Sequence, residues 1–176
     1  MRFVLVCGLI LSVVTSKAQT AFEEISADPN KSASVYYAYP EISEQYTLPP
    51  EGYTPFYISH YGRHGSRYLI SDSEYQTVME ILDKADAVGF LTDKGKSVRS
   101  RLEVVWRDAE GLGGQLTPLG YRQHRSISER MFYNFPDVFK GKRKISACST
   151  VVIRCALSMA TFCETLKGLN PELWFR

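Results

Sequence analysis

The 176-residue chain is poor in the residues that bind metals, with three histidines and four cysteines. Cys148, Cys155 and Cys163 lie far from the N-terminus, and their spacings match no zinc-binding pattern. No histidine lies close to them in the sequence. The sequence therefore predicts no metal site and no cofactor. Because three cysteines cannot all pair with one another, at least one thiol is expected to be free, and buried thiols are the expected state.

Internal repeats, low-complexity tracts and long apolar runs are also missing. The one apolar run, residues 3–14, is too short to cross a bilayer core of about 30 Å. It follows a positively charged start and precedes small residues at 16 and 18, a pattern typical of a signal peptide cleaved after Ala18. A membrane helix is the alternative. We expect residues 1–18 to be removed, and the mature chain to be periplasmic or secreted, without a membrane span.

Charge of one sign is not in excess either. Removal of Arg2 and Lys17 with the signal peptide lowers the count of Lys and Arg from 21 to 19, against 19 Asp and Glu. A formal charge near zero does not favour a nucleic-acid partner. With 44% hydrophobic and 23% charged residues, the composition is that of an ordinary globular domain.

The strongest chemical signal is a loop at residues 62–67 that follows a β-forming run at 56–58. Arg63 and Arg67 flank His64, and arginine presents a planar fork of donors that matches phosphate oxygens. A neutral histidine can attack phosphorus or relay a proton. The two glycines of the loop are expected to let the backbone approach an anion. A basic surface loop with a solvated histidine is the alternative.

The sequence Arg-His-Gly-Ser-Arg at residues 63–67 resembles the signature of the histidine acid phosphatases, the second branch of the histidine phosphatase superfamily. That family includes the phytases and the multiple inositol polyphosphate phosphatases. Its signature histidine becomes phosphorylated, and its two arginines hold the phosphate. The resemblance implies that His64 is the nucleophile and that Arg63 and Arg67 bind phosphate.

Two later segments extend the resemblance. Residues 116–123 are similar to the family's Leu-Thr-x-x-Gly-x-x-Gln segment, and residues 149–154 are similar to its Ser-Thr-x-x-x-Arg element. The arginine of that element is a third phosphate ligand, which implies the same role for Arg154. His124 lies near the start of a predicted helix and is expected to be a surface or interhelical histidine, with donation to a ligand as the alternative. Strand alternation places His60 on a core-facing side.

Local signals predict the secondary structure. We expect helices between residues 73 and 89, from 92 toward 110, from 118 to 133 and from 151 to 167, and a second core strand at residues 144–147. Thr117 is the expected cap of the third helix, and Ser149 or Thr150 that of the fourth. Strand, helices, strand and helix in this order predict an α/β fold with a histidine-phosphatase-like central sheet flanked by helices.

The domain organisation follows from these signals. Residues 19–51 are expected to form an N-terminal arm whose aromatic residues pack across the domain surface, with an aromatic ligand platform as the alternative. Residues 52–176 are expected to be the N-terminal part of a histidine phosphatase domain. Family members continue to a second histidine followed by an acidic residue that protonates the leaving alcohol, and neither is present here. We therefore expect the chain to be part of a longer phosphatase.

The expected function is metal-independent phosphomonoester hydrolysis through a phosphohistidine. Inositol polyphosphates such as phytate are the expected substrates, on the resemblance alone. A truncated phosphate-binding remnant without turnover is one alternative. The mutase-like branch of the superfamily is another, although Arg67 and the export signal speak against it.

Overall fold

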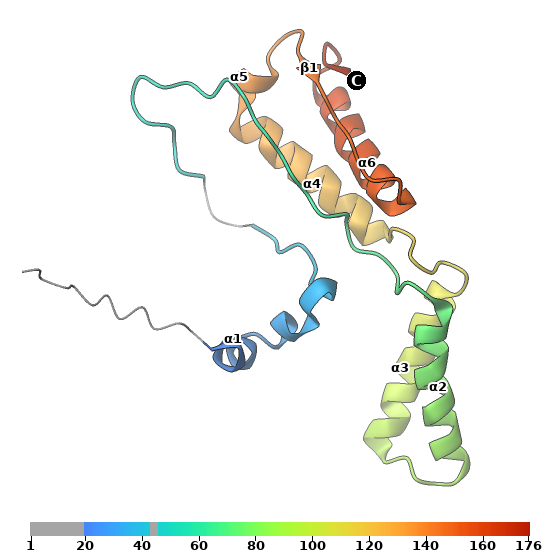
Figure 1. Cartoon of the computed structure of the whole chain (residues 1–176). Coiled ribbons are helices and arrows are strands. Elements are labelled where there is room, and N and C mark those ends of the chain that lie inside the picture. The colour runs from blue at the N-terminus through green and yellow to red at the C-terminus, as the bar shows by residue number, and fades with distance from the viewer. Residues whose placement is uncertain (1–19, 43–45) are drawn as a thin grey trace, which may run out of the picture. The chain divides into compact units, whose positions relative to one another are not determined.

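The structure, a computed structural model, describes residues 20–42 and 46–176. The expected signal peptide, with Cys7, lies outside the described residues. The chain divides into two units, the first ending at Tyr37 and the second spanning Ala38–Arg176 (Figure 1). No helix of the described residues is both long and apolar enough to cross a membrane. In chain order the elements are α1 (Ala21–Ala27), η1 (Pro29–Tyr36), α2 (Asp72–Ala87), α3 (Asp93–Ala109), α4 (Pro118–Asn134), α5 (Pro136–Phe139), β1 (Lys144–Ile145), α6 (Ile153–Leu169) and β2 (Trp174–Phe175).

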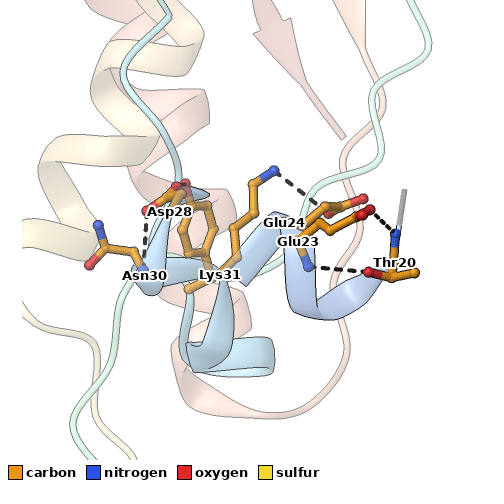
Figure 2. A network of polar contacts seen from close by, with 7 residues as sticks. Thr20, Glu23, Glu24, Asp28, Asn30 and Lys31 are labelled. Atoms are coloured by element: carbon orange, nitrogen blue, oxygen red, sulfur yellow. Dashed lines mark hydrogen bonds and ion pairs between the residues drawn. The ribbon is translucent and has the colours of Figure 1, made fainter. Parts of the chain in front are cut away.

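The first unit is held by local polar contacts, which Figure 2 shows from close by. Thr20 and Glu23 form a capping box at the start of α1: Thr20 Oγ1 accepts from Glu23 N at 3.3 Å, and the Glu23 carboxylate accepts from Thr20 N at 3.0 Å. An exposed ion pair of 3.6 Å joins Lys31 of η1 to Glu24 of α1. Neither helix contains a buried residue. The described helices of this unit therefore enclose no apolar core, and their exposed ion pair adds only about 0–1 kcal/mol.

The core of the second unit lies where α4, α5 and α6 meet the two strands. α4 packs along α6, and β1 pairs in parallel with β2. Phe139, Leu166 and Leu173 are buried at the centre. Partly buried side chains surround them: Ile58, Met131, Phe132, Phe135, Val138, Ile145, Phe162 and Phe175. Ile58 belongs to the extended segment that runs alongside α4 toward the loop at residues 62–67, so this segment is held on the helices by its side chains (Figure 1).

The expected α/β fold with a central sheet is wrong. Helices account for 56% of the described residues and strands for 4%, and the described part contains only the two-stranded sheet of β1 and β2. Residues 56–58 belong to no helix and to no strand of a described sheet. Their residue types favour a strand, but a sheet also needs a partner strand in register.

The helix predictions based on capping residues are mostly confirmed. Ser71, Thr92 and Thr117 are the N-caps of α2, α3 and α4, and each side chain accepts a backbone hydrogen bond. The predicted cap of the last helix at residues 149–150 is wrong, because α6 begins at Ile153 without a side-chain cap. α5, a single turn of four residues, is not among the predicted helices.

α2 and α3 pack side by side as a helical pair (Figure 1). The ring of Tyr75 in α2 lies 5.9 Å from that of Trp106 in α3. The hydroxyl of Tyr75 also accepts from Leu69 N at 2.9 Å, and Asp72 Oδ2 accepts from Gly111 N at 3.0 Å. These bonds attach the pair to the residues that follow the loop at 62–67.

The three described cysteines are free thiols. Cys155 and Cys163 are partly buried, and burial raises the pKa of the Cys163 thiol, which keeps it protonated at neutral pH. Cys148 is exposed, so the expectation of a buried thiol is wrong there, because it lies in the loop between β1 and α6. In the described ranges, no three His, Cys, Asp or Glu residues are grouped so that they could hold a metal ion.

Candidate functional site

Residues 62–67, called the signature loop from here on, are fixed to the start of α4 by hydrogen bonds. Ser66 N donates to Gln123 Oε1 at 2.7 Å. Ser66 O accepts from both Thr117 N at 2.9 Å and Thr117 Oγ1 at 2.8 Å. Gln123 is 9% exposed. Both main-chain polar groups of Ser66 are therefore satisfied by α4 and its capping residue.

Gly65 packs directly against the backbone of α4. A Cβ atom at Gly65 would lie 2.5 Å from Gly120 O and 2.6 Å from Gly120 Cα. A Cβ atom at Gly120 would in turn press against Ser66 O and Leu116. The glycine at position 65 therefore makes room for the helix, not for an anion as the sequence suggested. At Gly62 the nearest atom to a Cβ would be His60 Nε2, at 2.9 Å.

The loop is also attached to α6. Gly65 N donates to Ser158 Oγ at 3.1 Å, and Ser158 Oγ donates to Arg154 O at 2.8 Å. Ser158 is 3% exposed, so both bonds are shielded from water. One hydroxyl therefore links the signature loop to the turn of α6 that carries Arg154.

His64 is partly buried, and one ring nitrogen is engaged by the loop itself. Its Nδ1 lies 2.8 Å from Gly65 O. A carbonyl oxygen can only accept, so Nδ1 carries the proton in this contact. In neutral His64 the lone pair is then on Nε2, which is the atom able to attack an electrophile.

The two arginines of the loop have different protein partners. The Arg63 guanidinium carbon lies 5.3 Å from the centroid of the Tyr39 ring, within the range of a cation–π contact. Arg67 Nη1 donates to Tyr68 O at 2.8 Å. The guanidinium groups of the two arginines that flank His64 in the sequence are thus oriented by the protein, one by an aromatic ring and the other by a main-chain carbonyl.

Arg154 is the second residue of α6. Its Nη1 is 3.5 Å from Gly114 O, and its Nε is buried without a hydrogen-bond partner. Gly114 N donates to Leu69 O at 2.7 Å, so Arg154 lies beside the chain that leaves the signature loop. The contact to Gly114 is long for a hydrogen bond and therefore weak.

The three histidines of the chain lie near one another. Burial lowers the pKa of His124, a hydrogen bond with the Arg63 backbone raises it in part, and the nearby His60 and His64 lower it further. Burial also lowers the pKa of His60, whose ring stacks on Phe162 at 5.1 Å. Both side chains are therefore neutral at neutral pH. His124 is only 4% exposed, so it is a buried residue beside the loop.

Sequence reasoning missed the residues that hold the loop. The motif and the capping signal do not predict that Thr117, Gly120 and Gln123 contact the loop, although their three-residue spacing places them on one side of α4. Ser158 lies four residues after Arg154 and so on the same helix face, which was a usable signal. Tyr39 belongs to the aromatic residues of the predicted N-terminal arm, but its contact with Arg63 could not be predicted because the two residues are distant in the sequence.

Comparison with known proteins leaves the resemblance untested. The chain matches no protein-family model and no curated protein.

Proposed function

We propose that the chain catalyses the transfer of a phosphoryl group from a phosphomonoester to His64, followed by hydrolysis of the phosphohistidine. His64 Nε2 attacks phosphorus in line with the ester oxygen; the N–P bond forms as the P–O bond breaks, and the electron pair leaves with the alcohol oxygen. Water then attacks phosphorus, which releases phosphate and restores the imidazole.

The observation that carries this proposal is the hydrogen bond between His64 Nδ1 and Gly65 O. It fixes the ring and leaves the lone pair on Nε2. The supporting bonds from Gln123, Thr117 and Ser158 keep the carbonyl that orients the ring in place. A nucleophile held in this way loses little conformational freedom on reaction.

Arg63, Arg67 and Arg154 supply the charge that such a reaction needs. The transferred phosphoryl group carries negative charge on its equatorial oxygens, and arginines that flank the nucleophile stabilise it. The signature loop holds two of them beside His64, and α6 brings Arg154 to the chain that leaves the loop. Inositol polyphosphates, with several phosphate groups on alkyl oxygens, are the substrate class that we propose on the resemblance.

A second candidate function is phosphate binding without turnover of alkyl esters. An alkoxide is a poor leaving group and needs a positioned acid, which typically contributes about 10²–10⁴-fold in rate. The two histidines nearest to His64 have pKa values lowered mainly by burial, so neither His60 nor His124 carries the extra proton at neutral pH. This favours a protein with a nucleophile and anion ligands but a weak or missing proton donor.

The experiment compares two phosphoesters that differ in leaving group. p-Nitrophenyl phosphate releases a stable phenolate without help from an acid, whereas phytate releases an alkoxide. With ³²P-labelled esters, the proposal predicts a covalent label that survives alkali and is lost in mild acid, as expected for a phosphohistidine. Turnover of both esters supports phosphomonoester hydrolysis. Labelling by p-nitrophenyl phosphate but not by phytate supports the second candidate, a protein that lacks an effective proton donor.

The matched variants are His64→Ala and His60→Phe. His64→Ala removes the nucleophile and is expected to abolish the label. His60→Phe keeps an aromatic ring against Phe162 and is expected to leave the label unchanged. A label that persists in His64→Ala would refute the assignment of the nucleophile.

A further inference from the structure

Tyr39 contacts Arg63 at both ends of the arginine. The Tyr39 hydroxyl donates to the main-chain oxygen of Arg63, 24 residues away in the sequence. The Arg63 guanidinium carbon lies 5.3 Å from the centre of the same tyrosine ring. One side chain therefore fixes the main chain and the charged group of Arg63 together.

The Tyr39 ring is in turn placed by α4. It meets the ring of His124 edge-on, with centroids 5.8 Å apart and an angle of 77°. His124 is 4% exposed and lies next to Gln123, which bonds to the signature loop. Tyr39 is thus held by the same helix that holds Ser66.

The cation–π contact is compatible with anion binding. A cation near an aromatic ring is attracted by the ring's quadrupole, whereas a phosphate is bound by the N–H groups of the guanidinium. The contact therefore holds the Arg63 charge near Tyr39 through a different interaction from the one that binds an anion. Burial raises the pKa of Tyr39, while the charge of Arg63 and hydrogen bonds to it lower it in part, so the phenol is a donor at neutral pH.

We propose that Tyr39 is a positioning residue that orients Arg63 beside His64 before the phosphoester binds. This inference rests on the proposed function of His64 and extends it to a residue well before the signature loop. An arginine without such support would have to be ordered by each substrate, which weakens binding and slows the reaction.

The test uses the full chain with Tyr39→Phe, Tyr39→Leu and the control Tyr133→Phe. Tyr39→Phe keeps the ring under Arg63 and removes the hydroxyl, and Tyr39→Leu removes both contacts. Tyr133→Phe removes a hydroxyl from an exposed tyrosine elsewhere on α4. We expect phosphorylation of His64 by p-nitrophenyl phosphate to slow about tenfold in Tyr39→Leu and less in Tyr39→Phe, because small misplacement of a charged group is costly. The control should match the unchanged chain.

A double-mutant cycle separates positioning from general support of the fold. If Tyr39 acts through Arg63, Tyr39→Leu should add no loss of rate in an Arg63→Ala background. A further tenfold loss there, or an unchanged rate in Tyr39→Leu alone, would overturn the inference.

Failure of the proposed function gives a different result. If the unchanged chain is not labelled at all, the nucleophilic role of His64 is rejected, and calorimetric titration with inorganic phosphate decides on Tyr39. Weaker phosphate binding in Tyr39→Leu than in Tyr133→Phe supports positioning of Arg63. Equal binding in the two variants, or no binding by the unchanged chain, overturns it.

Discussion

The contact between Gly65 and Gly120 makes a sharp prediction about a single methyl group. The backbone of Gly65 does not lie in the left-handed region, so alanine can adopt its conformation. In the absence of a clash, Gly→Ala at such a position stabilises a protein by about 0.4–1 kcal/mol through the unfolded state. The added Cβ would, however, lie 2.5 Å from Gly120 O and 2.6 Å from Gly120 Cα. The contact thus reverses the sign of the expected effect.

The size of the effect follows from what the methyl group would meet. Overpacking at well-packed sites typically costs about 1–3 kcal/mol. Here the obstacle is helix backbone, which cannot rotate away as a side chain can, so we expect Gly65→Ala to lower the free energy of unfolding by about 3 kcal/mol. Each kcal/mol shifts the melting temperature of a domain of this size by about 2–4 °C, which predicts a decrease of about 6–12 °C.

The assay is urea unfolding followed by circular dichroism, with Gly168→Ala as the matched control. Gly168 lies near the end of α6, and a Cβ atom there would have no neighbour within 4 Å. Because alanine is the better helix former, the control should gain up to about 1 kcal/mol. A Gly65→Ala variant as stable as the unchanged chain, with an unchanged denaturant slope, would refute the close packing of the loop on α4.

Two further predictions concern the attachment of the loop and the two histidines with lowered pKa values. Gln123→Leu should cost about 1–3 kcal/mol in the same assay, because Ser66 N–H loses its acceptor, whereas Gln123→Glu should retain most of the stability. The folded-state pKa values of His60 and His124 lie below the ordinary value of 6.5. As the pH falls below about 6.5, the unfolded chain therefore binds more protons than the folded chain does. The free energy of unfolding should decrease as the pH is lowered, and it should decrease less steeply in His124→Gln. Stability independent of pH between 7 and 5 would contradict these lowered pKa values.

The helices could be predicted because their signals are local. Ser71, Thr92 and Thr117 each cap a helix within three residues of their own position, so a short stretch of sequence contains cause and effect. The sheet could not be predicted in this way. β1 pairs with β2 across α6, and nothing at residues 144–145 specifies that partner.

The candidate site shows the same division. Residue types identified His64 and its arginines as candidates, because the chemistry of an imidazole between two guanidinium groups is readable from the side chains alone. The residue type at position 65 predicts space for an anion beside the backbone, whereas that space is filled by the backbone of Gly120, 55 residues later. A glycine signals that something approaches closely, but the sequence does not say what approaches.

The residues that carry the resemblance fall into two groups, those that pack the loop on α4 and those whose chemistry packing does not explain. Leu116, Thr117, Gly120 and Gln123 contact the signature loop. The two segments therefore form one packed unit in which Gly65, Gly120 and Gln123 serve the fold. Because these residues are needed for packing, an active enzyme and an inactive relative would both contain them. His64 and Arg63 are different, because neither side chain belongs to the buried core cluster. Their chemistry is the part of the motif that packing does not explain, and substitutions there should affect phosphoryl transfer while leaving the unfolding transition in place.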